Sequence, residues 1–238
     1  MPLHTHDAPD VAHLADARAQ VLERIADACA RVGRDPGSVT LVAVSKTVPV
    51  AVLREAVAAG LTILGENRVQ EAEAKVGEVT GATWHLVGPL QSNKAKRALA
   101  TFDVIESVDT VELAARLDRL GADVGPSERV SVLLQVNVDG DPAKAGFDPG
   151  GLADAASAIA DLPRLDVRGL MTVGRLVERA EDARPTFVAL RALSERLRAS
   201  WPGLGSELSM GMSDDFEIAI EEGATIVRIG RALFGHRH

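Results

Sequence analysis

The chain has 238 residues, of which 46% are hydrophobic and 25% are charged, with a formal net charge of −8. These values are typical of a globular protein with a sizeable core, and they argue against general binding to nucleic acids or anionic membranes. The sequence shows no signal-peptide pattern and no apolar run long enough to span a bilayer, and its single cysteine cannot form an internal disulfide. It therefore predicts a soluble, cytoplasmic protein.

The first recognisable element is an amphipathic helix over residues 10–32, which ends at Gly33 and Pro36. Residues 1–9 form a polar start that matches no element, and we expect them to be disordered. The histidines near the two termini are interpreted as tail residues, and no metal site is expected.

Beyond this helix, short apolar runs alternate with helical patterns, as is typical of βα units and a parallel sheet. The eight expected strands are Leu41–Ser45, Thr62–Gly65, Trp84–Val87, Val104–Ser107, Val130–Val138, Val167–Val173, Glu207–Met210 and Ile226–Ile229. The expected helices include Pro49–Ala59, Val111–Leu120, Pro149–Ala160, Ala183–Ser200 and Asp214–Glu222. Eight strands in a chain of this length predict one α/β domain over residues 1–238, a (β/α)8 TIM-type barrel with an extra N-terminal helix. A doubly wound open sheet is the alternative.

Lys46 directly follows the first expected strand, whereas the other four lysines lie in polar or helix-like surroundings. A lysine at the mouth of a buried strand is expected to be desolvated, which favours the neutral amine. Such an amine can form a Schiff base with an aldehyde. The alternative is a lysine that reaches solvent or pairs with a carboxylate.

In a barrel of this type the chemistry lies at the C-terminal ends of the strands. Most of the expected strands carry or end in unusual polar residues: Ser45–Thr47, Glu66–Arg68, His85, Asn137, Met171–Thr172, Ser209–Ser213 and Arg228. We therefore expect one functional site on this rim of the barrel.

The residues at the ends of the last two expected strands are typical of a phosphate-binding site. Ser209 and Gly211 offer a hydroxyl and close approach to the backbone, and Gly230 opens a short helix whose first N–H groups would face an anion. The alternative for Gly230 is a tight turn out of the strand. Ser213 or Asp214 is expected to cap the helix that follows the seventh strand.

Arg228 lies two residues before Gly230 and therefore faces the same side of the strand. An arginine within an apolar strand needs a partner, which is either a carboxylate in a structural ion pair or a ring nitrogen of a bound ligand. A Schiff-base lysine, a phosphate cradle and a ring-facing arginine together describe a pocket for pyridoxal 5′-phosphate (PLP).

Six segments resemble the pyridoxal-phosphate homeostasis protein family, whose members are single-domain relatives of the alanine racemase N-terminal barrel. They are Val44–Thr47, Gly65–Glu71, Trp84–Lys94, Gly169–Met171, Ser209–Asp215 and Val227–Gly235.

The resemblance implies that Lys46 is the Schiff-base lysine, that Arg228 faces the pyridine nitrogen and that Asn67 lies near the ring. The expected phosphate-binding residues are Ser209, Met210, Gly211, Gly230 and Arg231, through side chains or nearby backbone amides. Arg231 stands where a smaller residue is expected. Lys144 is matched to a second lysine that is proposed to accept or pass on the cofactor.

An arginine cannot give up its proton to the ring nitrogen, which weakens the cofactor as an electron sink. The chain also has no tyrosine, whereas alanine racemases use one as a catalytic base. With the resemblance, these features favour a monomeric carrier in vitamin B6 homeostasis that delivers PLP to apoenzymes without robust catalysis. The alternatives are a PLP enzyme such as a racemase or lyase, with His85 as a possible base, and a barrel enzyme that acts on a phosphorylated metabolite.

Overall fold

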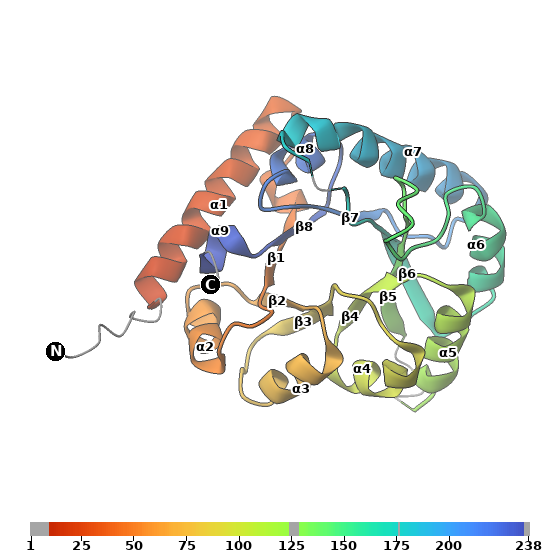
Figure 1. The fold of residues 1–238 in the computed structure, drawn as a ribbon, viewed down its shortest axis with the longest axis horizontal. Helices are drawn as coiled ribbons and strands as arrows, with labels where there is room; N and C mark the ends of the chain where they lie inside the picture. The colour runs from red at the N-terminus through yellow and green to blue at the C-terminus, as the bar shows by residue number, and fades with distance from the viewer. Residues whose placement is uncertain (1–9, 124–128, 176, 236–238) are drawn as a thin grey trace.

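The computed structural model describes residues 10–123, 129–175 and 177–235. The prediction that residues 1–9 are disordered falls outside the described ranges. The histidines His4, His6, His236 and His238 also lie outside them. The described chain forms a closed barrel of eight parallel strands in chain order, surrounded by helices (Figure 1). The (β/α)8 fold predicted from the alternating pattern is confirmed.

The strands are β1 Thr40–Val44, β2 Ile63–Glu66, β3 Thr83–Leu86, β4 Val104–Val108, β5 Val130–Gln135, β6 Leu165–Met171, β7 Glu207–Met212 and β8 Ile226–Ile229. The helices are α1 Val11–Arg31, α2 Val50–Ala58, α3 Val69–Val76, α4 Ala95–Thr101, α5 Val111–Gly121, α6 Leu152–Ala160, α7 Arg184–Ser200, α8 Phe216–Glu221 and α9 Arg231–Phe234. Short 3-10 turns cover Pro36–Ser38, Ser92–Lys94 and Ala180–Ala183.

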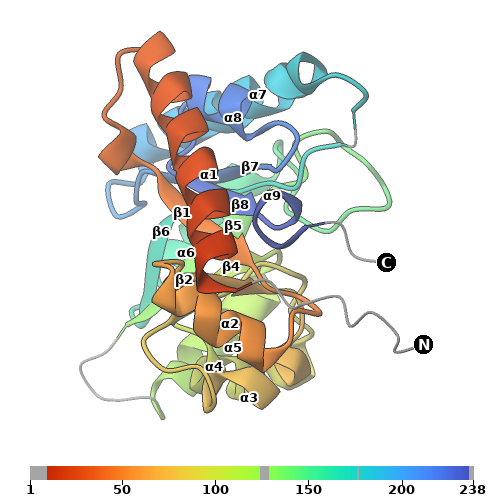
Figure 2. The same ribbon diagram turned by 90° about the vertical axis from the view of Figure 1, so that its left-hand side faces the viewer.

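Helix α1 is the expected addition to the barrel. It packs against α2, α8 and α9, outside the seam where β1 pairs with β8 (Figures 1 and 2). The Asp10 carboxylate caps its first turn by accepting a hydrogen bond from His13 N at 2.9 Å. Its inner face buries Leu14, Val21 and Ile25. No described helix is both long enough and apolar enough to cross a membrane.

The core consists of two layers. The larger one fills the space between the strands and the helices, and the smaller one fills the barrel interior with Val42, Val87, Val104, Leu133, Met171 and Ile226. Alternate residues of each strand face opposite sides of the sheet. Val42 and Val44 therefore face the interior, and Lys46 follows in the turn just beyond the end of β1.

Several predicted element boundaries differ from the structure by one to three residues, and two of these differences have a visible cause. The fifth strand ends at Gln135 instead of Val138 because the Asn137 amide bonds to the following loop, donating to Asp141 O at 2.8 Å. Helix α8 begins at Phe216 with Asp215 as its N-cap, and neither Ser213 nor Asp214 caps it. The Asp215 carboxylate instead accepts a hydrogen bond from Met212 N at 2.6 Å, which closes the turn after β7.

Candidate functional site

Lys46 lies in the turn that follows β1, and its side chain is exposed. The expectation that this lysine is desolvated is therefore wrong. The strand ends at Val44, and the chain turns away through Thr47, whose φ is 62°. The reactivity of Lys46 therefore does not follow from burial in a strand.

The buried lysine is Lys75 on α3, which is 7% exposed. Its ammonium group donates three hydrogen bonds: to Ser45 O at 3.0 Å, to Glu66 Oε1 at 2.8 Å and to Glu71 Oε1 at 3.0 Å. The sequence placed Lys75 in helix-like surroundings, and its burial was missed. The available signal was the spacing of four between Glu71 and Lys75 on a helix that follows the acidic end of a strand.

Glu66 belongs to the same cluster and is fully buried at the end of β2. Burial raises the pKa of its carboxyl group, against the hydrogen bonds from Lys75 and Ser45, which act to lower it. Glu71 is less buried. Burial acts to raise its pKa too, but hydrogen bonds from Thr47 N and Lys75 outweigh this and hold the pKa of Glu71 below its usual value.

A second polar cluster crosses the barrel interior. It consists of four buried side chains from four strands: His85, Glu106, Ser209 and Arg228. His85 Nδ1 lies 2.6 Å from Glu106 Oε1, and Ser209 Oγ donates to Glu106 Oε2 at 2.5 Å. Arg228 donates to Ser209 Oγ at 2.6 Å and to Thr172 O at 2.7 Å.

Glu106 is the anion of this cluster. Burial acts to raise its pKa, but the hydrogen bond and charge of His85, with the charge of Arg228, hold the pKa of Glu106 below its usual value. Arg228 Nη1 lies 4.0 Å from Glu106 Oε2, so the arginine has a carboxylate partner within the protein. Glu106 was missed in the sequence because it lies within a short apolar run and has no motif around it.

The cluster also fixes the position of two predicted site residues. The Ser209 hydroxyl lies in the barrel interior, between Glu106 and Arg228. His85 is 4% exposed, with its ring held against Glu106. These contacts orient both side chains toward the interior cluster.

The turns after β7 and β8 lie next to each other, and Gly230 N donates to Ser213 Oγ at 3.3 Å. Gly211 has a φ of 91°, and a Cβ there would lie 2.6 Å from Ala219 Cβ, so this turn requires glycine. Arg231 is exposed and pairs with Asp214.

Two other predicted residues occupy contrasting places. Met210 is fully buried, and its side chain lies in the layer between strands and helices rather than in the barrel interior. Asn67 is half-buried just after β2. A Cβ at Gly88 would lie 2.4 Å from Asn67 O, so the segments after β2 and β3 approach each other closely.

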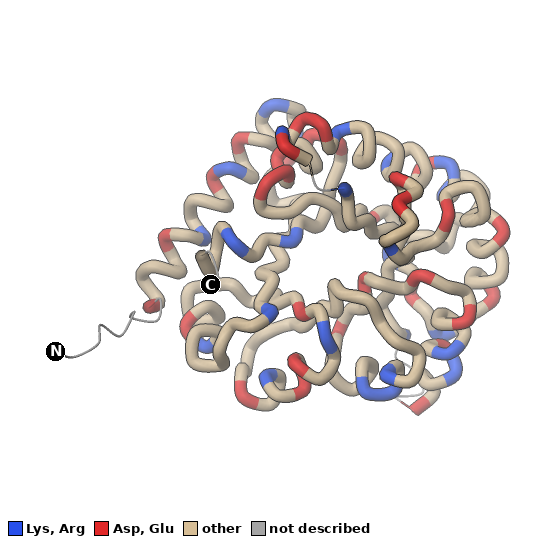
Figure 3. Tube along the Cα trace, in the orientation of Figure 1, with Lys and Arg blue, Asp and Glu red and all other residues tan. Residues whose placement is uncertain are grey.

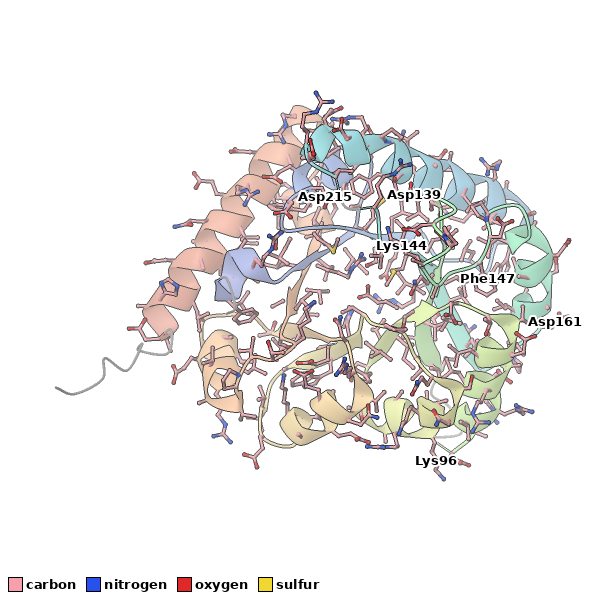
Figure 4. The ribbon with its side chains drawn as sticks, in the orientation of Figure 1. Lys96, Asp139, Lys144, Phe147, Asp161 and Asp215 are labelled. Atoms are coloured by element: carbon pink, nitrogen blue, oxygen red, sulfur yellow. The ribbon has the colours of Figure 1, made fainter. Side chains whose placement is uncertain are left out.

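Lys144 lies in the loop after β5, which Gln135 and Asn137 hold in place through bonds to its backbone carbonyls. Figure 4 shows Lys144 on the side of this loop that is nearer the barrel axis. Its Nζ lies 3.7 Å from Asp141 Oδ2 and makes no hydrogen bond within the described part of the chain.

Both basic and acidic positions border the inner side of the ring of strands, and both also lie on the outer helices and loops (Figure 3). In the residues that the structure describes, no three His, Cys, Asp or Glu side chains group together as metal ligands would. The C-terminal rim combines an exposed lysine, a buried guanidinium and glycine-containing turns.

The family described as alanine racemase, N-terminal domain, matches residues 16–238. The chain is 42% identical to the pyridoxal phosphate homeostasis protein of Escherichia coli (strain K12), over 96% of this chain and 97% of that one. It is 45% identical to the protein of the same name from Pseudomonas aeruginosa, over 94% of this chain and 96% of that one.

The chain belongs to the pyridoxal phosphate homeostasis protein family. A solved structure of another protein, PipY of Synechococcus elongatus with PLP bound, is 44% identical and superposes with a TM-score of 0.79. That comparison covers 89% of this chain and 100% of PipY. The resemblance found in the six sequence segments is thereby confirmed at the level of the family.

Proposed function

We propose that this protein binds PLP as a Schiff base on Lys46 and serves in intracellular PLP homeostasis, delivering the cofactor to apoenzymes. The observation that carries the proposal is the relationship to a protein solved with PLP bound, at 44% identity and over the whole of that chain. We also propose that the protein is a cytoplasmic monomer with one cofactor-binding domain over residues 1–238.

The residues of the rim fit this cofactor. PLP supplies an aldehyde that condenses reversibly with an amine, and Lys46 is an exposed lysine in the turn directly after β1. Val42, which faces the barrel interior from within β1, is paired with Arg228, so the arginine belongs to a deeper level of the barrel than Lys46. Such spacing suits a flat ring held between the two.

The phosphate would be held by the turns after β7 and β8, through the backbone of Met210, Gly211 and Gly230. Arg231 would contribute beside them, in exchange for its pairing with Asp214. We propose Asn67 as the neighbour of the ring. Ser209 would act indirectly, because its hydroxyl accepts a hydrogen bond from Arg228 and orients the guanidinium group.

Two features support a carrier over a racemase or lyase. The His85 ring is buried and hydrogen-bonded to Glu106, which limits its use as a base toward a substrate at the rim. The chain has no tyrosine to act as an opposed base. Lys144, whose Nζ is buried and makes no hydrogen bond within the described part of the chain, is our candidate for a transient second site during delivery.

The test combines cofactor transfer with α-proton exchange. The protein loaded with PLP is mixed with a PLP-dependent apoenzyme, and the recovered activity of that enzyme is measured. In a separate measurement, the loaded protein is incubated with alanine in deuterated water, and deuterium incorporation into alanine is followed. We expect transfer from the wild type and no exchange above free PLP. Lys46→Ala should lose the visible absorption of the covalent adduct and keep weak, noncovalent binding.

Lys144→Ala serves as the matched lysine variant. It should keep the visible absorption and slow the transfer. Exchange well above that of free PLP, lost in Lys46→Ala, would instead establish a PLP enzyme. Sedimentation of the loaded protein tests the proposed monomer.

A further inference from the structure

The turn that carries Lys46 is held on both sides by side chains of α3. On one side, the Lys75 ammonium donates to Ser45 O, the carbonyl directly before Lys46, at 3.0 Å. On the other side, the Glu71 carboxylate accepts a hydrogen bond from Thr47 N, the amide directly after Lys46. Lys75 and Glu71 are joined to each other at 3.0 Å.

We propose that Lys75 and Glu71 form a backbone clamp that fixes the turn Ser45–Thr47 and thereby positions the Lys46 amine for the cofactor. The role assigned to Lys46 rests on the proposed function, and the clamp adds two positioning residues to it. Neither residue is placed to touch the cofactor.

The clamp stabilises a turn whose backbone conformation is unusual. Thr47 has a φ of 62°, and within residues 10–123, 129–175 and 177–235 it is the only residue other than glycine with a positive φ. A β-branched residue rarely adopts this conformation, and it persists only where the surroundings hold it. The hydrogen bond to Glu71 provides such a hold at the strained residue itself.

The clamp is itself rigid. Lys75 is 7% exposed, and its three acceptors use the three hydrogens of an ammonium group. Glu66, fully buried, anchors it to β2 and also accepts from Ser45 Oγ at 2.7 Å. A helix, a strand end and the turn are therefore locked together around Lys46.

The test compares Glu71→Ala with Glu73→Ala, a matched control on the same helix. Glu73 pairs with Arg97 on the surface. Its replacement by alanine therefore removes a carboxylate and an ion pair but neither of the hydrogen bonds that Lys75 and Glu71 make to the Ser45–Thr47 turn. Two measurements are made on the protein without cofactor. One is hydrogen exchange of the amides in the turn; the other is acylation of Lys46, read against Lys96, whose side chain is 76% exposed.

We expect Glu71→Ala to speed exchange of the Thr47 amide and to change the acylation rate of Lys46 relative to Lys96. Its dissociation constant for PLP should rise by on the order of tenfold, the loss of one hydrogen bond. Glu71→Gln keeps an acceptor oxygen for Thr47 N, so it should restore much of the wild-type behaviour. Glu73→Ala should match the wild type in all three measurements.

Equal behaviour of Glu71→Ala and Glu73→Ala would overturn the clamp. So would a Glu71→Gln variant as impaired as Glu71→Ala, because the clamp acts through a hydrogen bond that glutamine can accept. If the wild type forms no adduct on Lys46, the proposed function fails, while exchange and acylation continue to report on the clamp.

Discussion

At the residue scale, the burial of two lysines is the reverse of what the sequence suggested. Lys46 follows an apolar run yet is exposed, because the strand ends two residues earlier and the chain turns. Lys75 stands in a polar helical pattern yet is buried, because α3 lies across the end of β2. Burial of a side chain at an element's end depends on the neighbour that covers it, which no local pattern contains.

Glu106 offers the sharpest test of the interior cluster. Glu106→Gln removes the anion that faces both His85 and Arg228 and leaves the buried arginine without its ion-pair partner, with only the charge of Asp215 remaining nearby. We expect the free energy of unfolding at pH 7 to fall by about 3 kcal/mol, as for other broken buried pairs. Urea unfolding monitored by tryptophan fluorescence measures this change.

The same variant should respond to pH in a defined direction. The pKa of Glu106 is lowered in the folded protein, because its contacts with His85 and Arg228 outweigh the raising effect of burial. The stabilisation it provides is therefore complete above the unfolded pKa, about 4.3, and is lost as pH falls through the lower folded pKa. The difference between wild type and Glu106→Gln should shrink in that acidic range, and a difference independent of pH would contradict this account.

At the element scale, the segments after β2 and β3 depend on one close approach. A Cβ at Gly88 would lie 2.4 Å from Asn67 O and 2.7 Å from Asn67 Cα, which are backbone atoms that cannot rotate away. We expect Gly88→Ala to lower the free energy of unfolding by about 1–3 kcal/mol, as overpacking does. It should also weaken PLP binding, because it moves the segment that carries Asn67.

Gly77→Ala is the matched control for this substitution. Gly77 has a φ of −68°, and a Cβ there would meet no heavy atom within 4 Å. We expect this change to leave the protein as stable or to stabilise it by up to about 1 kcal/mol. Equal destabilisation by both substitutions, measured by thermal unfolding, would show that the approach at Asn67 is unimportant.

The elements themselves were largely predictable, because each interior strand is a short apolar run and each helix carries one apolar face. The predicted bounds of the eighth strand, Ile226–Ile229, are confirmed. Two of the boundary errors arose where a side chain bonds to the backbone at the end of an element. Asn137 does this after β5 and Asp215 does it before α8, and neither bond has a periodic signal in the sequence.

At the scale of the whole molecule, the candidate site exists because the barrel closes. The pairing of β1 with β8 sets Val42 beside Arg228, residues from opposite ends of the chain, and so brings the Lys46 turn above the guanidinium. The glycines and the lysine of the rim could be predicted from their places at strand ends. The Glu106 cluster and the clamp under Lys46 could not, because their members come from separate elements and meet only in the folded barrel.

The central claim is that Lys46 is the main site, among the five lysines, at which the cofactor is held covalently. The most direct measurement is borohydride reduction of the protein incubated with PLP, followed by peptide mapping with mass spectrometry. This account predicts a reduced adduct on the peptide that contains Lys46, and none on the matching peptide of Lys46→Ala. A main adduct on Lys75, Lys94, Lys96 or Lys144, or no uptake of PLP, would contradict it.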